Sequence, residues 1–344
     1  FQLIHAIERC SIETMTATLN TVQDLEASVL AGTAITRDEA LSLIDAPLDQ
    51  LSAAADRIRA QMCGDGFDMC SIINAKSGRC PENCTFCAQS IRYPTISVDS
   101  YPLITADELV RQAQENKDKG VIRFSIVTSG RKLRRDEVRH ICEGVRRIKQ
   151  EVGIEVCISA GLLSAEDFQA LHDAGISRVH CNLETSRAYF PSICTSHTFD
   201  DKIATLQAAR DEGMSLCSGG ILGLGESMED RIDMALSARE LGVNSFPVNV
   251  LVAIEGTPLA GTEQLRPEEV QRCVAIFRFI LPQAAIRLAG GRELLGDDGK
   301  ACFQSGANSA ISGDMLTTTG TTIASDMALV KDLGYTVTLD HSHS

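Results

Sequence analysis

Three cysteines lie close together in the first third of the chain, at Cys80, Cys84 and Cys87, with the spacing C-x₃-C-x₂-C. Three thiolates at this spacing can hold three corners of a cubane iron–sulfur cluster and leave its fourth iron without a protein ligand. A structural zinc site is closed by a fourth ligand, so a zinc knuckle is the less favoured alternative. The open iron is a place for a small molecule, and Phe86 is placed to lay its ring against a bound base.

Composition narrows the class of protein that these thiols serve. The 344 residues are enough for one large α/β barrel or for two ordinary domains. The net charge of −14 argues against nucleic acid or anionic lipid as a partner. We find no apolar run of membrane-spanning length and no signal-peptide pattern, and therefore expect no membrane partner. The 13 cysteines are an odd number in a chain too long for a disulfide-rich scaffold, and some lie inside apolar strand-like runs, which favours a reducing cytoplasm.

The elements that must position the cysteines follow a repeating pattern. Apolar strand-like runs are predicted at Phe67–Ile73, Val121–Thr128, Ile154–Ala160, Ser177–Leu183, Ser215–Leu222, Ser245–Leu251, Ala284–Ala289 and Ala307–Ile311. Amphipathic helices are predicted between them at Ala106–Asp118, Arg135–Val152, Ala165–Ala174, Asp200–Glu212, Glu229–Leu241 and Pro267–Ile280. Thr105 and Ser164 have the sequence context of helix N-caps.

About eight β/α repeats predict a closed α/β fold, a (β/α)₈ TIM-type barrel, rather than an open sheet. We expect residues 61–344 to form the barrel and residues 1–60 to form an N-terminal helical extension packed outside it. Chemistry in such barrels takes place at the C-terminal ends of the strands. The triad follows the first predicted strand, so its loop belongs on that face.

At the level of motifs the chain resembles the radical S-adenosylmethionine enzymes and, among them, the biotin synthase family. The similarity extends from about Thr36 to the C-terminus. The segments that carry it are NAKSGRCPENC at 74–84, NLETS at 182–186, CSGGILGLGE at 217–226, GTPL at 256–259, RLAGGR at 287–292 and GANS at 306–309. The triad alone indicates the superfamily, whereas the ordered set indicates biotin synthase.

The resemblance implies a reaction and its partners. S-adenosylmethionine would chelate the open iron of a [4Fe-4S] cluster, and its reductive cleavage would give a 5′-deoxyadenosyl radical. This radical would abstract hydrogen from dethiobiotin, and an auxiliary iron–sulfur cluster would donate the sulfur that completes biotin. A flavodoxin or ferredoxin as electron donor, a homodimer and a cytoplasmic location are implied in the same way. A related radical maturase or mutase and a non-enzymatic metal-binding protein are the alternatives.

Several residues are candidates for binding S-adenosylmethionine. Asn182 and Glu184 are two apart on one strand and therefore share a face, where polar groups need a partner. The resemblance gives both of them contacts with S-adenosylmethionine, gives Asn182 a substrate contact as well, and places Glu184 at the ribose hydroxyls. Phe86 would stack on adenine, with a role as a core phenylalanine as the alternative. Lys202 matches a basic position that binds the methionyl carboxylate, although by itself it reads as a solvated helix lysine.

Two further groups are expected around the ligands. Gly219, Gly220 and Glu226 end the fifth predicted strand, where glycines allow close approach of backbone to S-adenosylmethionine or merely form a tight connection. Asn249 is polar in an apolar strand, and its amide offers the donor and the acceptor that suit a ureido ring, with a capped strand end as the alternative. Thr318 is expected to be a further substrate contact.

The auxiliary cluster is where this chain departs from the familiar pattern of the family. That pattern holds a two-iron cluster with three strand cysteines and one arginine. The second and third cysteines match Cys157 and Cys217, and the arginine matches Arg287, but Ser125 stands where the first cysteine is expected. A serine oxygen is a poorer iron ligand than a thiolate.

Cys70 offers a replacement, because it lies on the first predicted strand where the family has a serine near the cluster. Alternation places it on one face with Ile72, toward the barrel interior. Our hypothesis is that Cys70, Cys157 and Cys217 hold a different auxiliary cluster, a cubane with an extra sulfide rather than a 2Fe-2S centre. The alternative is a buried core thiol at Cys70 and a weakened two-iron cluster.

Three other side chains near the predicted cavity are of interest. Cys181 is out of phase with Asn182 and is expected in the core. Cys194 would reach the cavity only if its loop folds inward. His180 shares phase with Asn182 and is expected to be a satisfied interior histidine that faces the cavity.

Overall fold

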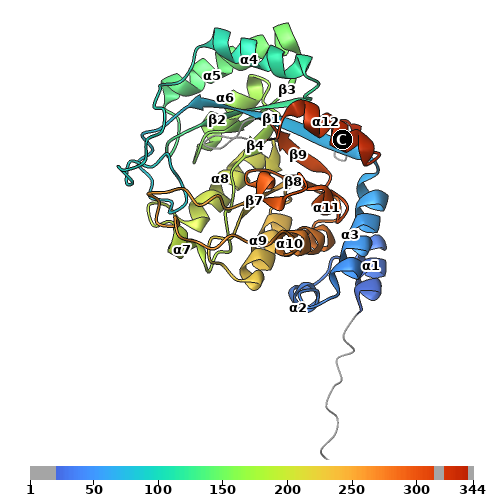
Figure 1. Ribbon diagram of the computed structural model, residues 1–344. Coiled ribbons are helices and arrows are strands. Elements are labelled where there is room, and N and C mark those ends of the chain that lie inside the picture. The colour runs from blue at the N-terminus through green and yellow to red at the C-terminus, as the bar shows by residue number, and fades with distance from the viewer. Residues whose placement is uncertain (1–20, 314–320, 340–344) are drawn as a thin grey trace, which may run out of the picture.

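Parallel strands close into a barrel surrounded by helices in the computed structural model, which describes residues 21–313 and 321–339 (Figure 1). Neighbouring strands pair in the order β1-β2-β3-β4-β5-β7-β8-β9, and pairing of β9 with β1 closes the ring. β6 continues the path of β5 and pairs with β7. The strands are β1 (Gly66–Lys76), β2 (Arg123–Thr128), β3 (Glu155–Ser159), β4 (Arg178–His180), β5 (Ser215–Cys217), β6 (Gly220–Leu222), β7 (Ser245–Val250), β8 (Ala285–Leu288) and β9 (Ser309–Ser312).

The helices form an outer layer around this ring. Those that follow strands include α4 (Ala106–Asp118), α5 (Arg135–Arg147) with a π-turn at Ile148–Val152, α6 (Ala165–Asp173), α8 (Phe199–Asp211), α9 (Met228–Glu240) and α10 (Pro267–Ile280). Shorter helical pieces are α7 (Phe190–Ile193), a 3₁₀ turn at Arg292–Leu295 and α11 (Lys300–Phe303), and α12 (Ile323–Asp332) comes last. None of the helices within the described ranges is long and apolar enough to cross a membrane.

The barrel prediction is confirmed, and the local signals explain why. Thr105 caps α4 by accepting a hydrogen bond from the backbone N–H of Glu108, and Ser164 forms a capping box with Asp167 at α6. Each cap fixes where a helix begins after its strand. The fifth predicted strand is split into β5 and β6, and β4 ends at His180, earlier than predicted; four residues further on, Glu184 has a positive φ of 73°.

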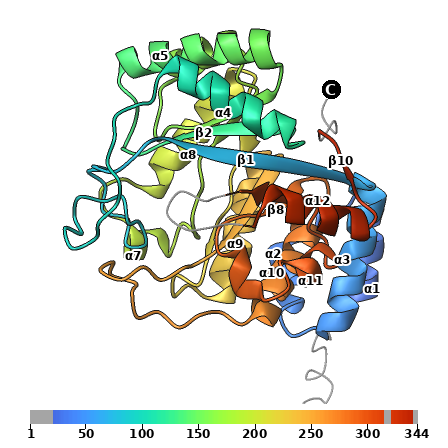
Figure 2. The same ribbon diagram turned by 45° about the horizontal axis from the view of Figure 1, so that its top comes forward.

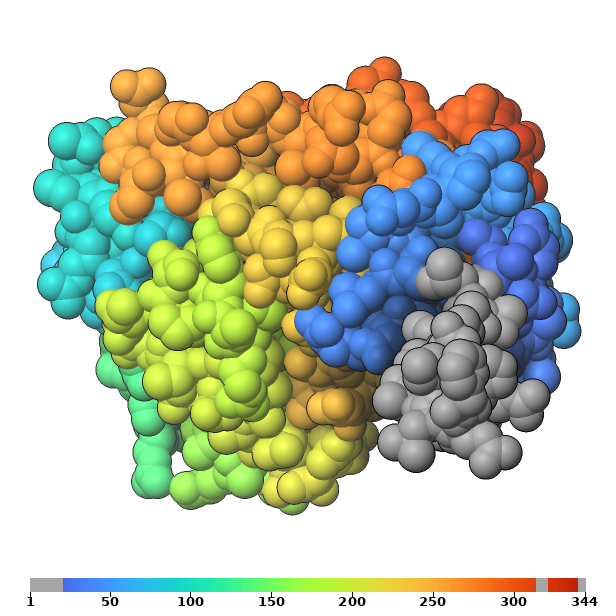
Figure 3. All heavy atoms as spheres, turned by 90° about the horizontal axis from the view of Figure 1, so that it is seen from below, coloured from blue at the N-terminus to red at the C-terminus, as the bar shows by residue number. Residues whose placement is uncertain are grey.

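Three helices precede the barrel: α1 (Val22–Leu30), α2 (Arg37–Ser42) and α3 (Leu48–Cys63). They lie on the outside, where α1 and α3 pack against α10 and α2 packs against α9 (Figure 3). At the other end of the chain, the short strand β10 (Thr336–Val337) pairs with the start of β1, an addition that the sequence pattern did not predict (Figure 2).

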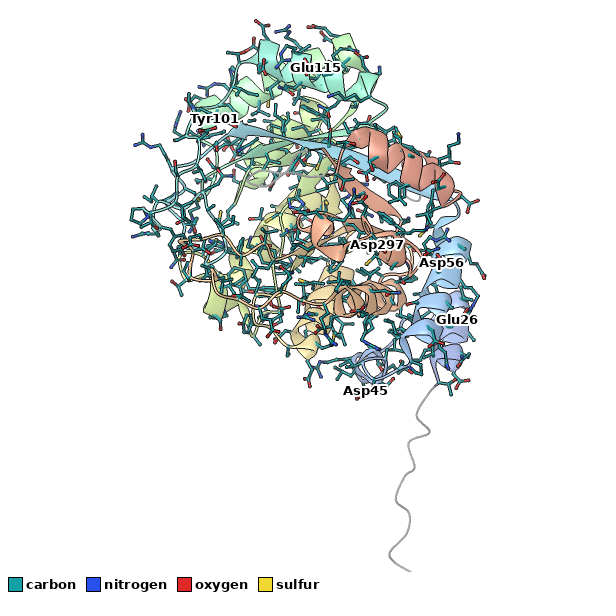
Figure 4. The ribbon with its side chains drawn as sticks, viewed as in Figure 1. Glu26, Asp45, Asp56, Tyr101, Glu115 and Asp297 are labelled. Carbon is teal, nitrogen blue, oxygen red and sulfur yellow. The ribbon has the colours of Figure 1, made fainter. Side chains whose placement is uncertain are left out.

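The open end of the barrel is formed by the C-terminal ends of the strands. The long loops after β1 and β7 lie together there, at the left of Figure 1, and the loop at Gly256 closely approaches Thr95 and Ile96. Exposed acidic residues such as Asp45 and Glu115 lie on the outer elements, away from the barrel axis (Figure 4). The excess negative charge is thus displayed on the outside, while the strands enclose the site.

Candidate active site

A cavity of about 420 Å³ occupies the barrel interior and opens at the rim. Both sets of cysteines that the sequence singles out line it. The lining includes the triad Cys80, Cys84 and Cys87, the strand residues Cys70, Cys157 and Cys217, and the candidate ligand contacts Phe86, Asn182, Glu184, Asn249 and Arg287. One chamber therefore holds two groups of thiols, one in the rim loop and one deeper between the strands.

The loop that carries the triad is shaped by its backbone. Gly78 has a φ of 71°, and its N–H donates to the side-chain oxygen of Gln89 at 2.8 Å. Cys80 then exchanges backbone hydrogen bonds with the returning segment, donating to Gln89 and accepting from Ile91. The N–H of Cys87 donates to the carbonyl of Cys84 at 3.1 Å. These contacts fold the loop back on itself and direct its thiols to the cavity.

The triad thiols lie in surroundings that oppose free thiolates. Burial raises the pKa of Cys80 and raises that of Cys87 to about 11. The pKa of Cys84 is raised mainly by its hydrogen bond to Cys194 and further by burial. Thiols of this kind become anions only when a cation binds them, which fits ligands of an iron–sulfur cluster.

Cys194 lies directly behind the triad, outside the cavity lining. Its Sγ is 3.7 Å from the Sγ of Cys84, and its loop is tied to the triad loop by a hydrogen bond from Thr85 N–H to the Ile193 carbonyl at 2.9 Å. Cys194 is buried, and His197 lies beside it with Nδ1 at 3.3 Å. Cys181 is buried in the hydrophobic core, as predicted.

The deeper thiols come from three different strands. Cys70 on β1, Cys157 on β3 and Cys217 on β5 are each 5% exposed or less. Ser125 on β2 stands beside Cys157 in the parallel register, and its hydroxyl hydrogen-bonds to that thiol. The sulfur atoms are close enough for the charge of Cys157 to affect Cys70 and for that of Cys217 to affect Cys157. The barrel thus brings the three cysteines of the exchange hypothesis together.

A layer of buried ions forms the floor beneath these thiols. The Oδ2 of Asp68 lies 2.9 Å from Arg178 Nη1, 3.1 Å from Arg287 Nη2 and 3.5 Å from Arg123 Nε. Arg287 also donates to the carbonyl oxygens of Asp68 and Ala310 and to the hydroxyl of Ser245. We call Asp68, Arg123, Arg178 and Arg287 the ion layer. It holds three cations and one anion, an arrangement that favours a negatively charged group above it.

The thiols respond to this layer and to His180. Burial opposes ionisation of Cys217, but the neighbouring charges of His180, Arg287 and Arg178 outweigh it and lower the pKa to about 6. The Nδ1 atom of His180 lies 3.4 Å from the Cys217 Sγ. At Cys70 burial dominates and raises the pKa to about 12, although Arg287 acts in the opposite sense.

The residues present fit an anionic iron–sulfur cluster at the deeper position. Three buried thiols are the ligands that iron–sulfur clusters use. In the ion layer Arg123 Nε and Arg287 Nη2 face Asp68 without a hydrogen bond of good geometry. The layer therefore carries two positive charges more than its one carboxylate balances, and an anionic cluster would offset them.

The first group of expected S-adenosylmethionine contacts consists of side chains at or near the cavity. Phe86, Asn182 and Glu184 line the cavity, and the Oε2 atom of Glu184 is buried without a hydrogen bond. Lys202 is buried rather than solvated, which corrects the reading of a solvated helix lysine, and its Nζ is 3.9 Å from Glu184 Oε1. Charge from Cys181 and Glu184 raises the pKa of Lys202 despite the opposing effect of burial.

Gly219, Gly220 and Glu226 have structural partners instead. A Cβ added at Gly219 would lie 2.0 Å from the Pro247 carbonyl oxygen, and one at Gly220 would lie 2.3 Å from that of Glu184. The carboxylate of Glu226 accepts hydrogen bonds from Gly223 N–H and from the Arg231 guanidinium, at 2.9 and 2.6 Å. None of these three residues lines the cavity, so their contact with S-adenosylmethionine stays a prediction.

Asn249 lines the cavity with part of its amide already used. Its Nδ2 donates to the Gly220 carbonyl at 3.0 Å, and its Oδ1 accepts from Gly290 N–H at 3.0 Å. One N–H and one lone pair are left for a ligand. Thr318 lies outside the described residues.

Sequence reasoning missed Asp68, Arg123 and Arg178 as site residues, and it missed the pairing of Cys194 with His197. The signal for Asp68 was present, because it is two residues before Cys70 and therefore on the same face of β1. A charged residue at such a position in a strand needs a buried partner. No comparable signal joins Cys194 to Cys84, since they meet only through the packing of two loops.

Comparison with family models and with known proteins shows which proteins this chain is similar to. Residues 75–238 match the model of the radical SAM superfamily, and residues 247–336 match that of the biotin and thiamin synthesis associated domain. Biotin synthase 2 of Corynebacterium diphtheriae is 99% identical over 330 residues, covering 96% of this chain and 100% of that protein. Biotin synthase of Brachyspira hyodysenteriae is 49% identical, covering 92% of this chain and 95% of that protein.

Solved structures support the same architecture. Methylornithine synthase matches with a TM-score of 0.79 at 19% identity, covering 92% of this chain and 98% of that one. The hydrogenase maturase HydG matches with a TM-score of 0.78 at 15% identity, covering 93% of this chain and 75% of that one. These two likenesses concern the fold, whereas the family follows from the sequence matches. The chain belongs to the biotin synthase family of radical S-adenosylmethionine enzymes.

Proposed function

We propose that this chain converts dethiobiotin to biotin by radical sulfur insertion. The observation that carries the proposal is the single cavity of about 420 Å³ lined by two separate thiol sets. When bound, a cluster on Cys80, Cys84 and Cys87 supplies the electron that cleaves S-adenosylmethionine, and an auxiliary cluster on the deeper cysteines supplies the sulfur atom. A substrate between the two sets would be within reach of both.

The residues of the rim would bind and orient S-adenosylmethionine. Phe86 would stack on the adenine, and Asn182 would offer an amide to the ligand. Glu184 would accept hydrogen bonds from the ribose hydroxyls, which its unpartnered Oε2 favours. Lys202, buried near Glu184, would hold the methionyl carboxylate. Gly219, Gly220 and Glu226 would act indirectly, by fixing the position of the backbone that carries the side chains in contact with S-adenosylmethionine.

Asn249 would orient dethiobiotin through its remaining N–H and lone pair, with Thr318 as a further contact. The barrel would keep water away from the reacting carbons, because the deeper thiols are almost completely buried above a closed floor. Exclusion of water matters for a reactive radical, since it prevents competing hydrogen transfer from other groups.

The auxiliary cluster in this proposal is bound by Cys70, Cys157 and Cys217. A cubane with an extra sulfide is preferred over a two-iron centre, because Cys70 supplies a third thiol where Ser125 replaces the expected one. Arg287 would act through its charge, since its guanidinium is engaged with Asp68, Ser245 and two carbonyl oxygens. A flavodoxin or ferredoxin as reductant, a homodimer and a cytoplasmic location complete the proposal by resemblance.

An anaerobic turnover assay with reconstituted protein, dethiobiotin, S-adenosylmethionine and a reductant tests this function. Biotin and 5′-deoxyadenosine are both expected from the wild type. Cys87→Ala should abolish both products, whereas Cys70→Ala should retain 5′-deoxyadenosine and lose biotin. Cleavage of S-adenosylmethionine without biotin in the wild type would refute the proposal and favour a maturase or mutase. Biotin formation by Cys70→Ala at the wild-type rate would refute the auxiliary ligand set alone.

A further inference from the structure

A compact group of metal-binding side chains shares one cysteine with the triad and adds two residues, Cys194 and His197, that have no part in the proposed reaction. It consists of Cys84, Cys194 and His197, whose ligand atoms lie within 4.8 Å of one another. Within the ranges that the structure describes, it is the group of three such residues that meets this spacing, and the triad Cys80, Cys84 and Cys87 does not. The triad is spread widely enough for a multi-iron cluster, whereas the group behind it is tight enough for a single ion.

The sulfur–sulfur distance in this group is that of a tetrahedral ion site. With metal–sulfur bonds of about 2.3 Å and metal–nitrogen bonds of about 2.05 Å, tetrahedral angles place two sulfur ligands about 3.8 Å apart and a sulfur and a nitrogen about 3.6 Å apart. The two sulfur atoms of Cys84 and Cys194 are 3.7 Å apart. The Cys194 Sγ lies 3.3 Å from Nδ1 and 3.8 Å from Nε2 of His197. The two sulfur atoms thus already have the spacing of a tetrahedral site, whereas an ion on Nε2 would require the His197 ring to turn, because the Cys194 Sγ lies closer to Nδ1.

The surroundings orient the histidine as metal sites do. His197 Nδ1 is 2.5 Å from the Oε2 of Glu82, which leaves Nε2 for an ion. Glu82 is held in place by the hydroxyl of Ser196 at 2.7 Å and by Arg131 at 3.4 Å. Around zinc, a carboxylate commonly accepts a hydrogen bond from one nitrogen of an imidazole whose other nitrogen binds the metal. His197 and Cys194 are also buried, at 8% and 5% exposed, whereas Cys84 is half-buried and lines the cavity, through which an ion could enter.

We propose that the cluster-free chain binds one thiophilic divalent cation, Zn²⁺ or Fe²⁺, through Cys84, Cys194 and His197, and that this ion and the [4Fe-4S] cluster exclude each other because both require Cys84. Water completes the tetrahedron. The two thiol protons pass to solvent on binding, so the two thiolates neutralise the ion and no electron is transferred. The ion would hold the two rim loops together while the cluster is absent, and its displacement would release Cys84 for iron–sulfur assembly.

Cobalt(II) is a suitable probe, because thiolate ligation gives it charge-transfer absorption and tetrahedral geometry gives it intense visible bands. The full chain, stripped of clusters under anaerobic reducing conditions, is titrated with Co²⁺ and then with Zn²⁺. We expect one equivalent of tetrahedral Co²⁺ with two thiolates, displaced by Zn²⁺. Protein reconstituted with the cluster on the triad should not give this spectrum.

Two substitutions separate the ion from the cluster. Cys194→Ser should weaken Co²⁺ binding at least tenfold and halve the thiolate-to-cobalt absorption, yet still assemble the triad cluster. Cys80→Ser should leave the Co²⁺ spectrum unchanged and lose that cluster. Because each variant is expected to keep one of the two metal centres, each serves as the folding control for the other, and Cys142→Ser should keep both.

The proposal is overturned by any of three results. The first is Co²⁺ binding by Cys194→Ser that is as tight as in the wild type. The second is loss of the Co²⁺ spectrum in Cys80→Ser, and the third is uptake of Co²⁺ with two thiolates by cluster-loaded protein. The first result would assign the ion to other thiols of the cavity, the second would assign it to the triad, and the third would show that Cys84 is not shared. None of these outcomes depends on whether the chain makes biotin.

Discussion

Asp68→Asn is expected to destabilise the cluster-free protein more than any other single loss of charge in the barrel interior. The substitution keeps the shape of the side chain but removes the carboxylate that lies 2.9–3.5 Å from three arginines. The side chains of Asp68, Arg123, Arg178 and Arg287 are 1–6% exposed, so water cannot replace the lost charge. Removing one partner of a buried ion pair costs about 3–5 kcal/mol, and we expect a loss in this range.

The measurement is urea unfolding of reduced, cluster-free protein under anaerobic conditions. The matched control is Asp233→Asn, whose partner Arg37 is largely exposed, with side chains 35% and 44% exposed. An exposed pair contributes about 0–1 kcal/mol, so the control should unfold nearly as the wild type does. A loss below about 1 kcal/mol for Asp68→Asn would refute the reasoning, because it would show that the ion layer is not stabilised by its carboxylate.

The pH dependence provides a second check on Asp68. Burial alone would raise its pKa, but the charges of Arg287, Arg123 and Arg178 outweigh burial and hold the pKa well below its ordinary range. A lowered folded-state pKa contributes stability that is present above the ordinary value and is lost as the pH falls through the folded value. The difference between the wild type and Asp68→Asn should therefore be constant between about pH 5 and 8 and shrink only at lower pH.

Three other substitutions test separate parts of the site. Gly220→Ala should lower the free energy of unfolding by about 1–3 kcal/mol in the same urea assay, because its Cβ would meet backbone. Cys70→Ala should reduce the iron and sulfide content of reconstituted protein to that of one cubane cluster, measured by chemical analysis. Lys202→Met should weaken S-adenosylmethionine binding roughly tenfold or more, measured by equilibrium dialysis, because a hydrogen bond to a charged group is lost.

Two of these substitutions have simple controls. Gly261→Ala should be nearly neutral, since nothing lies within 4 Å of an added Cβ and its φ is ordinary. Cys142→Ala, a buried thiol remote from the cavity, should keep the full iron content. Full iron content in Cys70→Ala would refute the exchanged ligand set, and unchanged dialysis for Lys202→Met would show that this lysine only packs.

The sequence predicted the barrel well because its signals are local. Alternating apolar runs and capped amphipathic helices repeat along the chain, and α4 and α10 have the predicted bounds. The break between β5 and β6 was not predicted, because it arises where Gly219 and Gly220 pack against the backbone of Pro247 and Glu184. Such an approach depends on neighbouring strands and leaves no periodic trace in the sequence.

The same distinction applies to the site. The triad is a local motif that can be recognised in the sequence. The hypothesis that Cys70, Cys157 and Cys217 face the same interior relied on alternation along the strands, and all three line the cavity. The ion layer was not foreseen, because its members are single charges on four strands whose meeting depends on barrel closure. Cys194 was left open for a similar reason, since only the packing of its loop against the triad loop places it beside Cys84.

The ion layer has a consequence for the distribution of electrons within the cavity. Three guanidinium groups against one carboxylate leave a positive field at the closed end of the barrel. An electron added to a cluster directly above this field is stabilised by it, and low-dielectric surroundings strengthen the effect. A cluster on Cys70, Cys157 and Cys217 should therefore have a higher reduction potential than the same cluster in a neutral pocket. This difference would favour electron transfer from a cluster on the triad to the deeper cluster.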